Sequence, residues 1–442
     1  MTSVAAAYCA LRRCFSWLER PSCGSEKLSE QTHSRMVSRC EHVYDNEPMK
    51  LLIYTHPFAP MVGGIETYTM LLARRFSEVA QTDTESVEVT VATQAQARDM
   101  DDSVLPFRVV RRPGLAQLVG LVREADVVHV ASPAFVPMLL AWVLRKPAVV
   151  EHDGYNSACP NGLLFYEPTK TDCPGHFLAR NYKECLRCNR ENLGSWGSFR
   201  LFLLTFPRRW LCLRMTLHIG PSNHVAGRVE MPRTQIVYHG IACPTGATQI
   251  EYKVGSPVCF AYVGRMVQPK GVPVLLRAAQ RLQKLGYEFR LKLIGDGPVR
   301  ADLERMTDEL GLRSRTIFTG FLQGDALDEA MREATAAVMP SIWQDVAPLA
   351  SIEHMMNGRL LIASDIGGLG ELVDGVGLKF PAGDDEALAD CLRRVLEEPR
   401  LARELGNSAR ERARLLFTLD RMAKDHLQVY AAIAPRKARG RA

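Results

Sequence analysis

Short apolar runs alternate with longer segments of helical periodicity along most of the chain. The first half carries apolar runs at 51–54, 87–92, 107–110, 126–130, 148–151 and 217–219. The second half carries runs at 258–263, 289–294, 316–318, 336–339, 360–363 and 377–380. Runs of this length are typical of strands buried on both faces. Their alternation with helices predicts an α/β protein with parallel, doubly wound sheets, which bind ligands at the carboxyl ends of their strands.

A loop rich in Pro, Gly and Thr at 242–257 separates the two series of strands. Loops of that composition interrupt regular structure, and the α/β pattern restarts after this one. The sequence therefore predicts two domains, since 442 residues are enough for two cores. We place the first domain at 49–245, with a cysteine-rich insert at 159–188, and the second domain at 255–416.

The two ends of the chain do not share this pattern. Residues 1–48 show no sustained period, and we interpret them as a disordered extension upstream of a natural start at Met49. A targeting segment is the alternative, although the acidic residues argue against a transit peptide. At the other end we expect a separate helix within 417–434 and a basic tail at 435–442.

The composition is that of an ordinary soluble globular protein, with 47% hydrophobic and 24% charged residues. The net charge of +6 is small, and the basic residues are spread along the chain. This distribution argues against nucleic acid as a partner. No apolar run reaches the roughly 18–20 residues of a membrane span, so we expect a cytoplasmic protein.

Residues 199–219 combine apolar residues with interleaved arginines. Such a segment is compatible with a basic amphipathic face that contacts anionic lipid, here at the inner face of the membrane. Pro207 is expected to break the segment, because proline interrupts helices. We favour a helix that packs on the sheet, and peripheral membrane contact is the alternative.

The segment 336–358 carries the first candidate chemistry. A buried strand at its start is followed by a polar loop, and Pro348 lies where a helix tolerates proline, in its first turn. Asp345 then lies in the loop before the helix, and Glu353 lies more than one turn inside it. The N–H groups and dipole of a helix N-terminus attract anions. The segment therefore suits a ligand with a phosphate flanked by hydroxyls, such as a nucleotide-sugar.

Two cations follow the first strand of the second domain, Arg265 and Lys270. An arginine fork and a lysine ammonium at the carboxyl end of a strand are suited to a phosphate. Gly63 and Gly64 stand at the first strand-to-helix turn, where glycine permits close backbone approach. The G-x-G at 295–297 lacks the third glycine of the dinucleotide fingerprint, which disfavours a nicotinamide-dependent dehydrogenase.

Two histidines near predicted strands differ in their expected roles. His152 directly follows the apolar run 148–151, so we expect it at the ligand-binding edge of the sheet. His129 falls inside a strand, and we interpret it as structural.

The twelve cysteines are not spread evenly, and four fall within one short segment. These are Cys159, Cys173, Cys185 and Cys188, with His176 nearby. Only the last pair has the spacing of a metal knuckle, and a second close pair is missing. We favour free thiols or a redox-labile loop, and a zinc site is the alternative.

In their order and spacing these motifs resemble the family 4 retaining glycosyltransferases, also called glycosyl transferase group 1. The resemblance covers the chain from Met49 to about Ala432. It is carried by Gly63-Gly64, Val263-Gly264-Arg265 with Lys270-Gly271, Gly295-Asp296-Gly297-Pro298, Pro340-Ser341, Asp345 with Glu353, and Gly367-Gly368 with Glu371. It implies the GT-B fold, in which two Rossmann-like domains face each other across a cleft and the last helix crosses back to the first domain.

The resemblance also implies roles for particular residues. In such enzymes a nucleotide-diphosphate sugar binds mostly to the second domain. Arg265 and Lys270 would hold its diphosphate, and Glu353 would bind the ribose hydroxyls. Asp345 matches the acid that faces the donor sugar. The positions that follow it would complete the donor site: Val346, Ala347, Pro348 and Leu349.

In the first domain the resemblance assigns two further positions. Gly64 would let its loop approach the phosphates, and His152 matches a histidine that contacts the transferred sugar. Asp345, Glu353 and His152 are thus the implied catalytic residues. The implied reaction is hexosyl transfer to a sugar or lipid-linked acceptor with retention of configuration, in polysaccharide or glycolipid biosynthesis. It requires no metal or other cofactor.

The chain departs from the family at three positions. Asp345 replaces the usual glutamate, which changes the reach of the carboxylate by about 1.5 Å, one bond length. Gly370 stands where proline is frequent, and His239 stands where asparagine is frequent. These departures put efficiency or sugar choice in question. Two alternatives stay open: a non-catalytic nucleotide-sugar-binding protein of the same fold, and a nucleotide-sugar epimerase.

Overall fold

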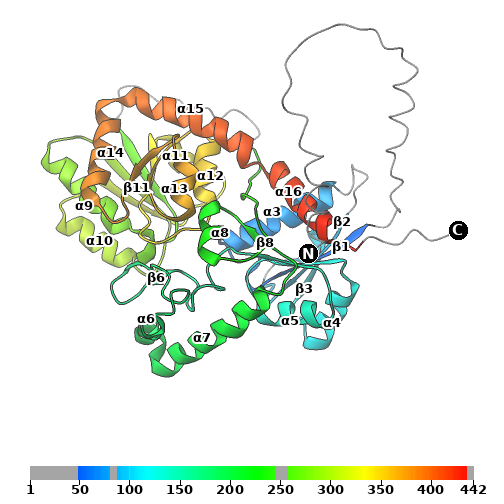
Figure 1. The fold of residues 1–442 in the computed structure, drawn as a ribbon. Coiled ribbons are helices and arrows are strands. Elements are labelled where there is room, and N and C mark those ends of the chain that lie inside the picture. Colours follow the sequence, from blue (N-terminus) through cyan, green and yellow to red (C-terminus); the bar gives the residue numbers. More distant parts are fainter. Residues whose placement is uncertain (1–47, 80–86, 99, 244–256, 436–442) are drawn as a thin grey trace, which may run out of the picture. The chain divides into compact units, whose positions relative to one another are not determined.

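The computed structural model describes residues 48–79, 87–98, 100–243 and 257–435. The expectations for a disordered extension at 1–48 and for a basic tail at 435–442 fall almost entirely outside the described residues, as does most of the loop at 242–257. Two parallel sheets with helices on both faces make up the described chain (Figure 1).

The first sheet has seven strands in the order β3-β2-β1-β4-β5-β8-β9. All its strand pairs are parallel. The strands are β1 (Met49–Thr55), β2 (Val87–Thr93), β3 (Arg108–Arg111), β4 (Val127–Val130), β5 (Ala148–Glu151), β8 (Leu217–Gly220) and β9 (Thr234–Ile236). In β1, Leu51 and Ile53 enter one core while Leu52 and Tyr54 enter another. This is the burial on both faces that continuous apolar runs predict.

The helices of the first domain lie between these strands in the sequence. They are α3 (Gly64–Val79), α4 (Leu115–Glu124), α5 (Phe135–Val143), α7 (Arg190–Cys212) and α8 (Asn223–Val229). The cysteine-rich insert follows β5 and contains the antiparallel pair β6 (Phe165–Tyr166) and β7 (Thr171–Asp172), and then α6 (Tyr182–Cys188).

The second sheet has six parallel strands in the order β12-β11-β10-β13-β14-β15. They are β10 (Cys259–Val263), β11 (Arg290–Ile294), β12 (Thr316–Gly320), β13 (Ala336–Met339), β14 (Leu360–Ser364) and β15 (Leu378–Phe380). The helices are α9 (Val272–Lys284), α10 (Arg300–Glu309), α11 (Asp325–Arg332), α12 (Leu349–Met356), α13 (Gly367–Val373), α14 (Asp385–Glu397) and α15 (Pro399–Leu416). The predicted α/β class with two doubly wound parallel sheets is confirmed.

The last helix, α16 (Leu419–Ile433), packs against the first domain. Ile241 and Thr418 form an isolated parallel bridge just before it. Within the helix, the Tyr430 hydroxyl lies 2.8 Å from Nδ1 of His129 on β4. The last described helix, α16, therefore contacts the first sheet, which also contains the first described strand.

The expected break at Pro207 is wrong. Pro207 lies inside α7, and the non-helical residue is Gly194, with φ 68° and ψ 172°. Proline removes a single backbone hydrogen bond, whereas the left-handed region that Gly194 occupies is open mainly to glycine. The expected packing on the sheet holds only in part, because many apolar side chains of α7 are exposed. In the described part of the chain, no helix has both the length and the apolar composition of a membrane span.

Candidate active site

The loop between β13 and α12 holds an ion pair. Asp345 is buried, and its Oδ2 lies 2.5 Å from Lys270 Nζ. The Ser341 hydroxyl donates a hydrogen bond to the same oxygen at 3.1 Å. Lys270 ends a short 3₁₀ turn, Gln268–Lys270, after β10. Because β10 and β13 are neighbours, their carboxyl ends bring the lysine and the aspartate together.

Glycines allow three backbone segments to converge at this loop. Gly271 has φ 67°, and a Cβ at this position would lie 1.8 Å from the Pro340 carbonyl oxygen. A Cβ at Gly368 would lie 1.9 Å from the Val346 carbonyl oxygen. The Gly368 N–H also donates to the Asp345 carbonyl at 2.7 Å. These glycines therefore fix the backbone that presents the Asp345 carboxylate.

The remaining second-domain candidates surround the ion pair. Arg265 is exposed and forms no ion pair with any described residue. Pro348 is the N-cap of α12, one position earlier than expected, and Val346 to Leu349 lead into that helix. Glu353 is half-buried on α12; burial and then the Asp328 carboxylate raise the pKa of its carboxyl.

The two first-domain candidates differ in accessibility. Gly64 is exposed as the first residue of α3, and a Cβ there would meet nothing within 4 Å. His152 is fully buried; its Nε2 lies 3.1 Å from Nδ1 of His218, and its Nδ1 lies 3.3 Å from the Ser157 hydroxyl. Burial, the His218 ring and Arg209 lower the pKa of His152 to about 3, so the ring is neutral at pH 7. A contact between His152 and a sugar stays a prediction.

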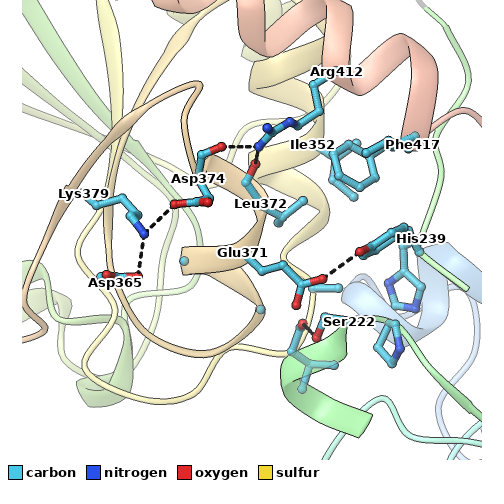
Figure 2. Close-up of a pocket in the computed structure, with 17 residues that line it drawn as sticks. Ser222, His239, Ile352, Asp365, Glu371, Leu372, Asp374, Lys379, Arg412 and Phe417 are labelled. Atoms are coloured by element: carbon cyan, nitrogen blue, oxygen red, sulfur yellow. Dashed lines mark hydrogen bonds and ion pairs between the residues drawn. The ribbon is translucent and has the colours of Figure 1, made fainter. Parts of the chain in front are cut away.

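A cavity of about 460 Å³ is lined by residues of both domains (Figure 2). Glu371 of α13 accepts a hydrogen bond from the Tyr238 hydroxyl at 2.8 Å across this cavity. On its other side Lys379 pairs with Asp365 at 3.2 Å and with Asp374 at 2.8 Å. Val346 and Ala347 also line it, whereas Arg265, Lys270, Asp345 and Glu353 do not.

Gln344 holds the two domains together beside the ion pair. Its side-chain amide donates to Asp172 Oδ1 at 2.5 Å and to the Cys173 carbonyl at 3.2 Å. Its Oε1 accepts from Arg228 Nε at 2.8 Å and lies 2.9 Å from His224 Nε2. Sequence reasoning did not single out Gln344, because its partners are 116 to 172 residues away and no local pattern announces them.

Glu151, at the end of β5, is the centre of a buried network of titratable groups. The Tyr68 hydroxyl donates to it, and Nε2 of His129 and of His239 lie 3.2 and 3.3 Å from its oxygens. Burial raises the pKa of Glu151, but hydrogen bonds from His129, His239 and His426 outweigh it and hold the pKa well below the usual range. His129 is therefore part of the structural core, as its place inside a strand indicates.

His239 carries the balancing positive charge of this network. Burial lowers the pKa of His239, but the carboxylates of Asp153 and Glu151 raise it to about 10. Glu151 has the geometry to hold a metal ion, either with His129 and His426 or with Asp153 and His239. In both groups ring nitrogens lie 3.0 to 3.5 Å from carboxylate oxygens, although Nε2 of His129 and both carboxylate oxygens of Asp153 have no hydrogen-bond partner in the described part of the chain.

Residues 249–412 match the family model of the glycosyl transferases group 1. These residues are a glycosyl transferase group 1 domain. The domain includes the Lys270–Asp345 pair, Arg265 and Glu353. Among curated relatives, the alpha-D-kanosaminyltransferase of Streptomyces kanamyceticus is 32% identical over 150 residues, which is 34% of this chain and 39% of the relative. The D-rhamnosyltransferase WbpZ of Pseudomonas aeruginosa is 30% identical over 197 residues, 42% of this chain and 50% of the relative.

The chain thus spans about two fifths to one half of the length of these relatives. Solved structures extend the fold comparison beyond the group 1 domain. Anabaena HepE in complex with UDP and glucose has a TM-score of 0.65 at 17% identity, covering 87% of this chain and 100% of that chain. Sucrose-phosphate synthase from Thermosynechococcus elongatus has a TM-score of 0.65 at 19% identity, covering 87% and 98%. The chain has the GT-B fold.

Proposed function

We propose that this protein transfers a hexosyl group from a nucleotide-diphosphate sugar to a sugar or lipid-linked acceptor, with retention of anomeric configuration. The observation that carries the proposal is the Lys270–Asp345 ion pair, at the carboxyl ends of two neighbouring strands in a group 1 domain. Arg265 is exposed near the same strand end. Cations and a carboxylate in this arrangement suit a ligand that carries both phosphates and hydroxyls.

The proposed chemistry rests on stabilising a leaving group. When the glycosidic bond to the diphosphate breaks, negative charge develops on the phosphate oxygens. Arg265, Lys270 and the backbone N–H groups at the start of α12 would stabilise that charge before it forms, which is how fixed donors lower a barrier. Asp345 would hold a sugar hydroxyl, and Glu353 the ribose. The leaving phosphate itself would accept the proton of the acceptor, so no metal or other cofactor enters the scheme.

The first-domain side of the cleft would complete the site. Gly64 leaves open space at the N-terminus of α3, where a phosphate oxygen has room to approach the backbone N–H groups. His152 is neutral, and a neutral imidazole can accept from a sugar hydroxyl or donate to it. Contact with His152 would require the cleft to open, because its side chain is fully buried.

Donor transfer and donor hydrolysis assays test the proposal. Transfer by Lys270→Ala and Glu353→Ala should fall by at least about tenfold, the effect of losing one hydrogen bond to a charged group. Lys284→Ala and Glu309→Ala are matched controls, because both side chains are exposed on helices away from the loop. Activity in the first pair equal to that of the controls would contradict the site.

The same assays separate the alternatives. A non-catalytic protein of this fold would bind a nucleotide-sugar in a thermal-shift screen and show no turnover with any acceptor. An epimerase would change the donor sugar without an acceptor. HepE was solved with UDP and glucose, so UDP-sugars are the first donors to screen here.

An exposed apolar face supports a lipid-linked acceptor. More than half of the exposed large apolar side chains of the described chain lie on or at the ends of α5 and α7. They are Phe135, Val136, Trp142, Val143, Leu193, Trp196, Phe199, Leu203, Leu204, Phe206, Trp210 and Leu213. The Trp142 and Trp210 rings are in edge contact at 5.2 Å, which joins the two helices into one face. We call it the α5/α7 face.

Exposed arginines border this face, among them Arg145, Arg200 and Arg214. Aromatic and aliphatic side chains with a basic border are typical of surfaces that lie in the interface of an anionic membrane. We propose that the α5/α7 face binds the inner surface of the membrane from the cytoplasm and brings the cleft to a lipid-linked acceptor.

Co-sedimentation with phosphatidylcholine vesicles, with and without phosphatidylglycerol, tests this contact. The wild type should sediment with the anionic vesicles. Trp196→Glu combined with Leu203→Glu should abolish sedimentation, because two charges would enter the lipid interface. Val104→Glu combined with Leu415→Glu is the control, since both side chains are exposed, by 74% and 73%, outside the α5/α7 face. Equal sedimentation of the two double variants would contradict the assignment.

A further inference from the structure

The cysteine-rich insert folds so that its four cysteines line one pocket. Each is buried, each is a free thiol, and the pocket that they share has a volume of about 10 Å³. We call these residues the thiol cluster: Cys159, Cys173, Cys185 and Cys188. Cysteines elsewhere in the described chain do not join it; the Cys212 thiol, for example, packs 3.6 Å from the sulfur of Met138.

The fold supplies the second pair of ligands that the spacing lacks. Cys185 and Cys188 are three residues apart on α6 and therefore share one face of that helix. Cys159 and Cys173 are far apart in sequence, but a backbone hydrogen bond of 2.8 Å from Cys173 N–H to the Leu164 carbonyl closes the segment between them. Four thiols from three segments thus surround one cavity.

The size and surroundings of the cavity favour a single ion. A volume of about 10 Å³ is near that of one water-sized sphere, which leaves room for one ion. The Glu167 N–H and the Asn161 side-chain amide both donate to the Cys188 sulfur at 3.5 Å. Such donors stabilise metal-bound thiolates from outside the ligand set.

We propose that the thiol cluster binds one structural zinc ion in a tetrahedral four-sulfur site. The buried carboxylate–histidine groups around Glu151 already have ligand atoms within 4.8 Å of one another. The sulfurs are less close, so the ion would draw them inward to the Zn–S distance of about 2.3 Å. Binding replaces the four S–H protons by four Zn–S bonds and releases the protons, with no change in oxidation state.

The site would brace the contact between the two domains. Asp172 ends β7 and Cys173 follows it, and Gln344 donates hydrogen bonds to both. The next residue, Asp345, carries the ion pair with Lys270. Zinc at the thiol cluster therefore fixes the insert where it touches the candidate donor loop. This inference does not depend on the identity of the donor or acceptor.

Metal analysis of the purified full-length protein is the first test. About one equivalent of zinc per chain is expected, and replacement by Co²⁺ should produce the thiolate-to-cobalt charge-transfer absorption of a four-sulfur site. Wild-type protein that is folded and binds neither zinc nor Co²⁺ would overturn the proposal, as would iron in place of zinc or a disulfide within the cluster.

Paired variants supply the second test. The double variant Cys185→Ser with Cys188→Ser should lose its zinc and unfold at a lower temperature, whereas Cys212→Ser should keep about one equivalent. Full zinc content in the double variant would overturn the assignment of the ligands. If the double variant does not fold, the Co²⁺ spectrum of the wild type decides alone.

Discussion

Asp345 is the residue on which the candidate site depends most. Its side chain is one methylene shorter than the glutamate that the family resemblance implies at this position, yet it reaches Lys270 at 2.5 Å. The approach is possible because Gly271 lets the lysine turn lie directly on Pro340. The close backbone approach at Gly271 therefore contributes to the Lys270–Asp345 contact.

The charge and the length of this side chain can be separated by substitution. Asp345→Asn keeps the size but removes the charge, and we expect kcat to fall by about 10² to 10³, as for loss of one preorganised electrostatic contact. Asp345→Glu keeps the charge but moves it by about 1.5 Å, so the loss should be smaller. Steady-state transfer kinetics measure both, with Asp302→Asn on exposed α10 as the control. A larger loss in Asp345→Glu would show that length, not charge, dominates.

Gly368 permits a second close backbone contact at the same loop. A Cβ in Gly368→Ala would lie 1.9 Å from the Val346 carbonyl oxygen, so the loop must move and the free energy of unfolding should fall by about 1–3 kcal/mol. Gly120→Ala is the matched control, because that glycine lies in α4 with nothing within 4 Å. There alanine should stabilise by up to about 1 kcal/mol. Urea unfolding measures both, and equal stabilities would contradict the close contact.

At the scale of elements, the positions of the strands could be predicted from the sequence, but the break in α7 and the contacts between distant segments could not. The run 336–339 coincides with β13 and the run 148–151 with β5, because strands buried on both faces leave a continuous apolar signal. The break of α7 was misplaced because proline is a visible signal, whereas the unusual dihedral angles of Gly194 are set by the surrounding packing.

Contacts between segments that are distant along the chain could not be predicted from the sequence either. Gln344 looks like any polar loop residue, and its role depends on α8 and the insert, which only the fold brings to it. The same holds for the thiol cluster. A search for two close cysteine pairs misses Cys159 and Cys173, because the fold of the segment between them, and not their spacing, brings them together. The position of Arg265 and Lys270 after the first strand of the second domain could be predicted, because that strand leaves a continuous apolar run.

The Glu151 network ties α16 to the first sheet, and its charge makes this attachment depend on pH. His239 has a folded pKa of about 10 against 6.5 for the free side chain. Between these values the folded state binds more protons than the unfolded state, so stability falls as pH rises. The contribution of His239 is complete below pH 6.5 and is lost as pH passes about 10.

His239→Gln should therefore cost about 3 kcal/mol near neutral pH, the usual effect of removing one partner of a buried charge pair. The difference from wild type should shrink as the pH approaches 10. His354→Gln is the control, since burial lowers the folded pKa of His354 to about 3. Its ring is therefore neutral in the folded state throughout this window, and it gives no stability that is lost as the pH rises toward 10. Urea unfolding at several pH values measures both, and a constant offset for His239→Gln would contradict the assigned charge.

At the scale of the whole molecule, the mechanism depends on the strength of the contacts between the two domains. Glu371 of α13 accepts hydrogen bonds from the Asn223 side chain at 2.8 Å, from the backbone N–H of His224 at 3.1 Å and from the Tyr238 hydroxyl at 2.8 Å. These partners all belong to the first domain, and the carboxylate faces the N-terminus of α8, which favours negative charge.

Glu371→Ala should loosen this contact while leaving each domain intact. We expect a larger radius of gyration in small-angle X-ray scattering and an apparent KM for the donor raised by at least about tenfold, because a hydrogen bond to a charged group contributes about 1.5–3 kcal/mol. Glu386→Ala is the control, since that exposed carboxylate lies on α14 and not between the domains. An unchanged radius with unchanged KM would contradict this role of Glu371 and would mean that other contacts, such as those of Gln344 and the Ser222–Val346 hydrogen bond, hold the domains. In that case removing zinc from the thiol cluster, rather than the Glu371 substitution, should separate them.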